Sequence, residues 1–444
     1  MECRHELPYF LRLARDTDRC LPRFRWVGCQ LDALRKCFTI GSLRKALNTL
    51  PKTLDDTYGR ILTNIDEEYT QDAMKVLQCL VYSPRPMRIS EVAEVLAVDI
   101  DDKQRFDIER RLPEPADILR ICSSLVTASP RRKASKNRYD LDSTSGPHDP
   151  NSLDAPEDLD SDYPDELDPG YSDSSSSGDL DRTLRLAHFS VKEYLTSERI
   201  QAGPVSTFHL AEAPAALFMA KTCLFYLLQF RSPGLLSTNT PRDFPLARFA
   251  AEYWIRYATL AQAHGEQTLD SLILQLLDSR DECFANWIRI YDPDAPWEPP
   301  NFTRNIETIA PPLYYMSLSG LVGATKILLE RGADANELSR GRGNAAQAGA
   351  SQGRGVVLRW LPGNGASVNC QGGECGNALV AAVSNGNEPV LTLLLENGAD
   401  IERKGKEGHT PLTYAALKGN EAVVRLLIGK GANIEATNRR GRQR

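Results

Sequence analysis

The chain has 444 residues, which is long for one hydrophobic core, so we expect about two to four domains. Hydrophobic residues make up 41% and charged residues 25% of the sequence, as in an ordinary globular protein. The formal net charge of −6 argues against nucleic acid as the main partner, because that partner requires a large basic surface.

Cysteine usage and the lack of targeting segments indicate a cytoplasmic protein. The ten cysteines have no paired framework, so we expect free thiols in a reducing compartment. Cys370 and Cys375 are close together, but no second pair at zinc spacing accompanies them, and we predict no metal site. Residues 1–19 are charged throughout and do not form a signal peptide. No apolar run approaches the ~20 residues of a membrane span, so we expect a soluble protein without membrane contact.

Residues 1–82 have the pattern of a helical segment. Leu31, Leu34, Cys37 and Phe38 have helix spacing, and a second short helix begins at Ser42. Two more helices are predicted at 54–65 and 73–82.

A winged-helix-like module is expected at 83–139 and 182–200. Pro84 and Pro86 break the chain, and a short helix follows at 89–98 with Ser90 as its N-cap. Another helix is predicted at 118–126, and the regular pattern resumes at 184–195. Small helices closed by a strand pair fit this module, with the intervening insertion in its wing.

The insertion, residues 140–181, is expected to be disordered. It carries fourteen Asp or Glu residues and no Lys or Arg, and it cannot bury enough apolar surface to offset its chain entropy. A basic run, RRKASK at 131–136, precedes it. The simplest interpretation is a solvated loop, and the alternative is a phosphorylatable regulatory segment that pairs with basic surfaces.

Residues 201–304 are expected to form a helical linker region. Its aromatic residues have helix spacing and are predicted to lie in a core rather than a ligand site: Phe225, Tyr226, Phe249, Tyr253, Trp254, Tyr257 and Trp287.

The last part of the chain repeats with a period of 33 residues. Gly-Ala followed by Asp, Ser or Asn recurs at Gly332, Gly365, Gly398 and Gly431, and a second glycine recurs at Gly320, Gly353, Gly386 and Gly419. Each unit is expected to form a helix, a glycine turn, a second helix and a loop. TPLTYAA at 410–416 and LLIGKGAN at 426–433 resemble the signatures of the ankyrin repeat.

This resemblance implies an ankyrin-repeat solenoid of four units at 305–437. The second unit is degenerate, because GNAAQAG at 343–349 is polar and glycine-rich where a buried helix face belongs, and we expect it to be locally weak. Residues 438–444 resemble the start of a truncated fifth repeat without a polar cap. The resemblance implies a protein partner, bound by exposed loop tips; the candidate partner-binding residues are Arg340, Arg342, Gln371, Glu374, Arg403, Lys404, Lys406 and Glu407.

A second resemblance covers the part before the repeats. FRWV at 24–27 with QLDAL at 30–34, LPKTLDDTY at 50–58 and HFSVKEYL at 188–195 resemble fungal NACHT–ankyrin proteins, which are signal-transducing NTPases related to innate immune receptors. In that family these blocks follow the nucleotide-binding core, in the same order. The resemblance therefore implies a mainly α protein: a helical segment, a winged-helix-like module, a helical linker and the repeats.

The sequence lacks the P-loop that a NACHT core requires. No G-x-x-x-x-G-K-[ST] pattern occurs, and about 23 residues precede the first match, too few for the core. The resemblance places His188 at a position that senses nucleotide in related proteins, and without the core we interpret it as structural or vestigial. The six histidines are dispersed, and no H-E-x-x-H or G-x-S-x-G pattern occurs. We therefore predict no enzymatic activity and no cofactor.

Three hypotheses follow. The first is a non-enzymatic scaffold, the sensor or arm part of a NACHT–ankyrin-like receptor in signal transduction. The second is a regulator that docks on an intact NACHT relative through its winged-helix region. The third is a fragment of a gene product whose missing amino-terminal part is an NTPase.

Overall fold

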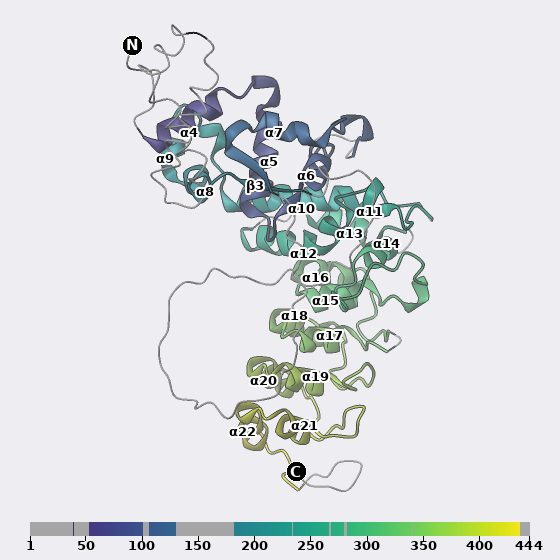
Figure 1. The fold of residues 1–444 in the computed structure, drawn as a ribbon. Coiled ribbons are helices and arrows are strands. Elements are labelled where there is room, and N and C mark those ends of the chain that lie inside the picture. Colours follow the sequence, from purple (N-terminus) through teal and green to yellow (C-terminus); the bar gives the residue numbers. More distant parts are fainter. Residues whose placement is uncertain are drawn as a thin grey trace, which may run out of the picture.

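The computed structural model describes residues 39, 53–100, 106–129, 182–232, 234–265, 268–278, 282–339 and 341–435. The helices predicted before residue 53, the acidic insertion and residues 438–444 lie outside the described residues. The described chain is mainly helical (Figure 1): a helical region packs at one end, and a stack of helix pairs leads from it toward the carboxyl terminus.

The first helices lie close to their predicted positions. The structure has α4 (Leu54–Thr63), α5 (Thr70–Tyr82) and α6 (Ile89–Leu96). The prediction that Ser90 caps the third of these was wrong, because Ser90 lies inside α6 and Arg88 occupies the N-cap position. The carboxylate of Glu91 accepts the Arg88 amide at 2.7 Å, so the helix begins earlier than the serine indicated.

A small antiparallel sheet follows, with strand order β1 (Met87–Arg88), β3 (Thr183–Leu186) and β2 (Val126–Ser129). The predicted helix at 118–126 is only partly correct: α7 spans Ile118–Ile121, and Val126 already belongs to β2. Val126 pairs with Leu186 and Ser129 with Thr183, so residues 130–181 connect two paired strands. The winged-helix assignment itself remains a prediction.

Seven α-helices of four to seventeen residues follow in the described part of the chain, and the apolar ones among them build the main core. The seven are α8 (Phe189–Thr196), α9 (Glu198–Gln201), α10 (Glu212–Leu227), α11 (Thr240–Asp243), α12 (Ala247–Ala263), α13 (Asp270–Leu276) and α14 (Cys283–Ile290). Six of the seven predicted core aromatics are buried, and Tyr253 is half-buried. The Trp254 and Trp287 rings meet edge to face, 5.1 Å apart between centroids.

Buried charges attach the first helices to this core. Arg85 forms a two-pronged pair with Glu91, at 2.8 and 2.9 Å, and its guanidinium lies 5.1 Å from the ring centroid of Phe249 on α12. Because Glu91 is fully buried, loss of Arg85 would leave this carboxylate in the core with Arg88, at 3.8 Å, as its remaining cation.

Four helix pairs stack in the carboxyl-terminal part: α15 (Pro312–Ser319) with α16 (Val322–Glu330), α17 (Ala345–Ser351) with α18 (Gly355–Trp360), α19 (Ala378–Asn385) with α20 (Glu388–Glu396), and α21 (Pro411–Lys418) with α22 (Glu421–Gly429). Both predicted glycine series have positive φ, between +68° and +94°. The 33-residue period is therefore a period of left-handed turns, which glycine adopts without strain.

The second unit forms a buried helix despite its composition. Gln347 is buried but donates to the Cys370, Gly372 and Gly376 carbonyls at 3.1 to 3.4 Å. Its side-chain oxygen accepts the Asn344 amide at 2.9 Å in a capping box. The polar residue thus connects α17 to the next loop, and the expected local weakness stays a prediction.

The first helix pair shares its core with the helical region. Tyr315 of α15 lies 5.8 Å from Trp287 and 6.0 Å from Phe284, measured between ring centroids. The main apolar cluster includes Leu321 and Ala324, and it reaches Ala348 of the second unit. The helix stack is therefore packed directly on the helical region.

Candidate protein-binding surfaces

The loops between helix pairs form a row of tips, which we define as residues 337–343, 370–376 and 403–409. A backbone hydrogen bond closes each tip: Ser339 N to Gly343 O, Gly372 N to Gly376 O, and Gly405 N to His409 O, at 2.9 to 3.0 Å. The three bonds share the 33-residue period. In Figure 1 the connecting loops lie along one side of the stack.

Side chains at the base of the tips fix the distance between neighbouring units. Asn336 donates to the Gly365 carbonyl at 2.8 Å and accepts the Ser367 amide at 2.7 Å. Asn369, one period later, donates to the Gly398 carbonyl in the same way, at 2.8 Å. These bonds pre-order the tip backbone, so a partner would lose little entropy by binding it.

Most of the predicted partner-binding residues lie on this row. Gln371, Glu374, Lys404, Lys406 and Glu407 are exposed, and Arg403 is half-buried. Arg340 lies outside the described residues. The structure brings the five exposed residues to one side of the array on two adjacent tips.

Arg342, predicted to be an exposed tip residue, forms ion pairs within the chain instead. Its guanidinium donates to Asp292 at 2.6 and 3.1 Å and to Asp294 at 2.7 Å. Both aspartates lie in the loop after α14, and Asp292 also pairs with Arg304 at 2.6 Å. We call Asp292, Asp294, Arg304 and Arg342 the ion-pair cluster; it connects the first tip to the helical region.

Burial and charge act differently on the two aspartates. Burial opposes ionisation of Asp292, but hydrogen bonds from Arg342 and Arg304 outweigh it and hold the pKa of this carboxyl below its ordinary value. Burial raises the pKa of Asp294, helped by the negative charges of Asp292 and Glu374. Asp292 is therefore the carboxylate that the cluster stabilises most.

Two exposed apolar residues beside the tips were missed from the sequence. Trp297 is 61% exposed, in the proline-rich loop that carries Asp292 and Asp294, and Leu338 on the first tip is 49% exposed. Leu338 packs so closely on Gly372 of the next tip that a Cβ there would lie 2.7 Å from its Cδ2. Exposed aromatic anchors are typical of binding hot spots.

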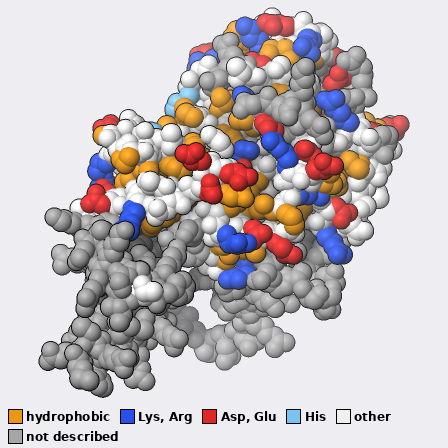
Figure 2. Space-filling model, turned by 90° about the horizontal axis from the view of Figure 1, so that it is seen from above, with side chains coloured by type: hydrophobic (Ala, Val, Ile, Leu, Met, Phe, Trp, Pro, Cys, Tyr) orange, Lys and Arg blue, Asp and Glu red, His pale blue; other side chains and the backbone are white. Residues whose placement is uncertain are grey.

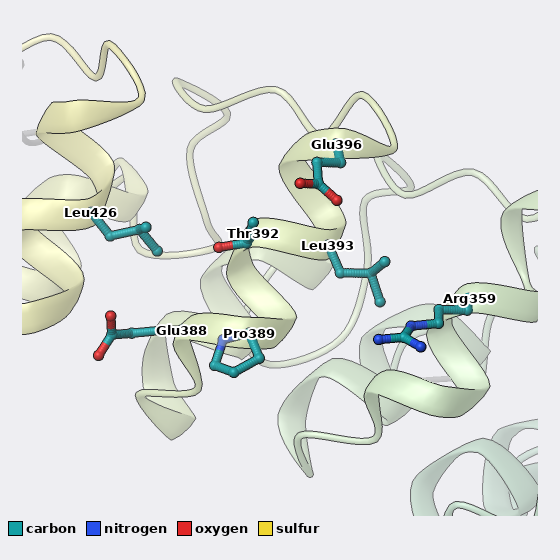
Figure 3. Close-up of a pocket in the computed structure, with 7 residues that line it drawn as sticks. All are labelled: Arg359, Glu388, Pro389, Thr392, Leu393, Glu396 and Leu426. Atoms are coloured by element: carbon teal, nitrogen blue, oxygen red, sulfur yellow. The ribbon is translucent and has the colours of Figure 1, made fainter.

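A second surface lies on the opposite, outer helices of the stack (Figure 3). Its centre is α20, with Arg359 of α18 on one side and Leu426 of α22 on the other. The hollow has a volume of about 600 Å³. The α20 residues that line it are Glu388, Pro389, Thr392, Leu393 and Glu396.

His188 has a structural position in the helical region. It is the N-cap of α8, and its Nδ1 accepts the Ser190 amide at 3.2 Å. The Ser190 hydroxyl lies 2.7 Å from the same nitrogen and 2.8 Å from the Tyr58 hydroxyl of α4. His188 therefore links α8 to α4 through Ser190.

Charges are mixed on the face that Figure 2 shows: acidic, basic and apolar side chains alternate over its described part, without one dominant sign. Within the described ranges, no group of three or more His, Cys, Asp or Glu side chains could hold a metal ion. No helix in the same ranges is long and apolar enough to span a bilayer.

Comparison with known proteins identifies the helix stack. The family model "Ankyrin repeats (3 copies)" matches residues 344–438. The carboxyl-terminal part is an ankyrin-repeat array. The α15–α16 pair precedes the matched residues and continues the same period.

A curated relative covers more of the chain. The chain is 36% identical over 333 residues to "Azaphilone pigments biosynthesis cluster protein L" of Monascus ruber. The match includes 72% of this chain and 61% of the relative, so the chain spans less than two thirds of that protein's length. The relative's name refers to a biosynthesis cluster and gives no reaction.

Proposed function

We propose that this chain is a non-enzymatic platform that binds a partner protein through the tips of its ankyrin repeats. The observation that carries the proposal is the row of closed tips, whose backbone is fixed between units while Gln371, Glu374, Lys404 and Lys406 stay exposed. Stacked repeats offer such a surface preformed. Trp297 adds an aromatic anchor at the end of the row nearest the helical region.

We further propose that the platform is the sensor or arm part of a NACHT–ankyrin-like signalling protein. The three sequence blocks before the repeats support this assignment by their motifs and their order. The curated relative contains further residues beyond the match, which leaves room in that protein for another domain. Its name gives no catalytic activity to transfer to this chain.

A second candidate is docking on an intact NACHT relative through the helical region. The observation that favours it is Phe189, which is 57% exposed directly after His188 at the start of α8. Nucleotide hydrolysis by a longer gene product is the third candidate.

Affinity capture with matched variants tests the first proposal. The full chain, purified and immobilised, would be exposed to extract from cells that express it, beside Trp297→Ser and the double variant Lys404→Glu/Lys406→Glu. We expect at least one protein to be captured by the wild type and lost with both variants. Capture that is identical for all three chains would refute binding at the tips.

Two further measurements separate the alternatives. Phe189→Ser in the full chain would lose a partner that docks on the helical region and retain one that binds the repeats. Nucleotide binding and turnover, measured with ATP or GTP and magnesium, should be absent for the full chain. Stoichiometric hydrolysis would contradict the non-enzymatic assignment.

A further inference from the structure

The outer surface over α20 combines exposed apolar groups with charges that have no ion partner. Pro389 is exposed and Leu393 and Leu426 are half-buried, so apolar atoms form the floor of the hollow. Glu388 and Glu396 are exposed on α20, and neither pairs with a cation within the part of the chain that the structure describes. By contrast, Glu421, which occupies the position of Glu388 one repeat later, pairs with Arg425 at 2.5 Å.

The shape of this surface excludes a small buried ligand. Four of its seven lining residues are exposed, namely Arg359, Glu388, Pro389 and Glu396, so a bound molecule would be covered from one side only. Small-molecule sites enclose most of their ligand. A volume of about 600 Å³ that is open along a helix fits a polypeptide segment better.

The backbone of the surface selects the conformation of that segment. All seven lining residues lie on helices, and none of them belongs to a β-strand. No strand edge is offered, so an extended peptide would leave its own backbone groups without protein partners. A helix brings its backbone bonds with it and needs only side-chain contacts.

The charged side chains of this surface select the sequence of the partner helix. Glu388 and Glu396 are eight residues apart on one helix, which corresponds to about 12 Å along the axis. A partner helix lying along α20 would face both carboxylates with side chains about seven or eight positions apart. Arg359 on the other side would favour an acidic or neutral group there.

We propose that this outer surface binds an amphipathic helix of a partner protein, whose apolar face covers Pro389 and Leu393 and whose two basic residues pair with Glu388 and Glu396. The site lies on the helices opposite the tips and goes beyond the tip surface assigned above. The two surfaces lie on the same repeats but share no residue, so the two proposals can fail independently.

A displayed peptide library is the probe. Randomised peptides of about 16 residues, long enough for four helical turns, would be selected on the full wild-type chain with excess soluble Thr392→Arg protein as competitor. We expect enriched sequences with an apolar stripe and paired Lys or Arg residues at the stated spacing. Their Kd should rise at least tenfold for Glu388→Lys/Glu396→Lys.

Glu298→Lys/Glu307→Lys is the matched control, because it makes the same two charge reversals at exposed residues outside both surfaces. It should change the Kd of the selected peptides less than twofold, and circular dichroism would verify that all variants fold. The inference is overturned if no sequence is enriched. It is also overturned if the enriched peptides lack the basic pair, or if they bind Thr392→Arg as well as they bind the wild type.

Discussion

The ion-pair cluster around Arg342 should hold the repeat array on the helical region, and Arg342→Met tests this directly. Methionine keeps an unbranched stem of similar length and removes the guanidinium. Asp292 would lose its contacts at 2.6 and 3.1 Å, and Asp294 the contact at 2.7 Å. The side-chain hydrogen bonds that join this tip to the loop after α14 would then be lost.

The expected cost follows from the burial of the cluster. Removing one partner of a buried ion pair costs about 3–5 kcal/mol. Three features reduce that value, and the first two are that the Arg342 side chain is 21% exposed and that Asp292 keeps Arg304 at 2.6 Å. Asp294 also keeps the Tyr314 hydroxyl at 2.9 Å. We therefore expect a loss of about 2–3 kcal/mol.

The loss should be local, so hydrogen exchange is a better assay than a global melt. Repeat arrays open unit by unit, and one midpoint would average over them. Exchange measured on peptides covering α15 to α18 gives the free energy of local opening, which should fall by the stated amount. Peptides from α10 and α12 should change much less.

Arg425→Met is the control, because its pair with Glu421 is exposed on both sides, at 77% and 75%. Exposed pairs at this helix spacing contribute about 0.3–0.5 kcal/mol. If Arg342→Met changes the opening energy no more than Arg425→Met does, the cluster does not hold the array. The contact between the first tip and the helical region would then add no measurable stability to the array.

Three other predictions concern the same array. Gly376→Ala should lower the free energy of urea unfolding by about 1–3 kcal/mol more than Gly398→Ala does. Both glycines have positive φ, but only a Cβ at 376 would meet backbone atoms, 2.4 Å away. Equal losses would refute the clash. Gln347→Leu should cost about 1–3 kcal/mol in the same assay, because it leaves the Asn344 amide and the half-buried Cys370 and Gly372 carbonyls without their Gln347 partner. The exposed Gln352→Leu should cost less than about 0.5 kcal/mol. A neutral Gln347→Leu would refute this. Asp292→Asn should lower the free energy of unfolding by its full amount above about pH 4 and by less as pH falls through the lowered native pKa of Asp292. The reason is that native Asp292 binds protons more weakly than it does in the unfolded chain. A difference between wild type and variant that grows toward low pH would contradict this sign.

The repeats could be predicted from the sequence because their signal is local. A glycine at each helix end is required by positive φ, and Gly386 and Gly419 both have that conformation. Pro411 at the first position of α21 is a local signal of the same kind, because a helix does not need a backbone N–H donor at that position. Such positions depend on the nearest few residues and not on the rest of the fold.

The missed features depend on residues that are distant in sequence. Arg342 resembles a solvated tip residue until Asp292, 50 residues earlier, is placed beside it. Gln347 appears unsuitable for a buried helix until the carbonyls 23 to 29 residues later are in position. Val126 belongs to a strand because Leu186 pairs with it across residues 130–181. Trp297 lies in an irregular loop, where no periodicity distinguishes an exposed ring from a buried one.

The two proposed surfaces place different requirements on the same repeat. The unit containing α19 and α20 carries Glu374 at its tip and Glu388 on its outer helix, and its Val380 and Leu391 are buried. Coupling between two sites requires an element with two arrangements that both ligands bias. Within the described repeats, hydrogen bonds between units and a close-packed core hold the helices in one arrangement. We therefore expect partners at the tips and on the outer surface to bind together, each with the affinity it has alone. Such independence is what a scaffold that joins two proteins requires.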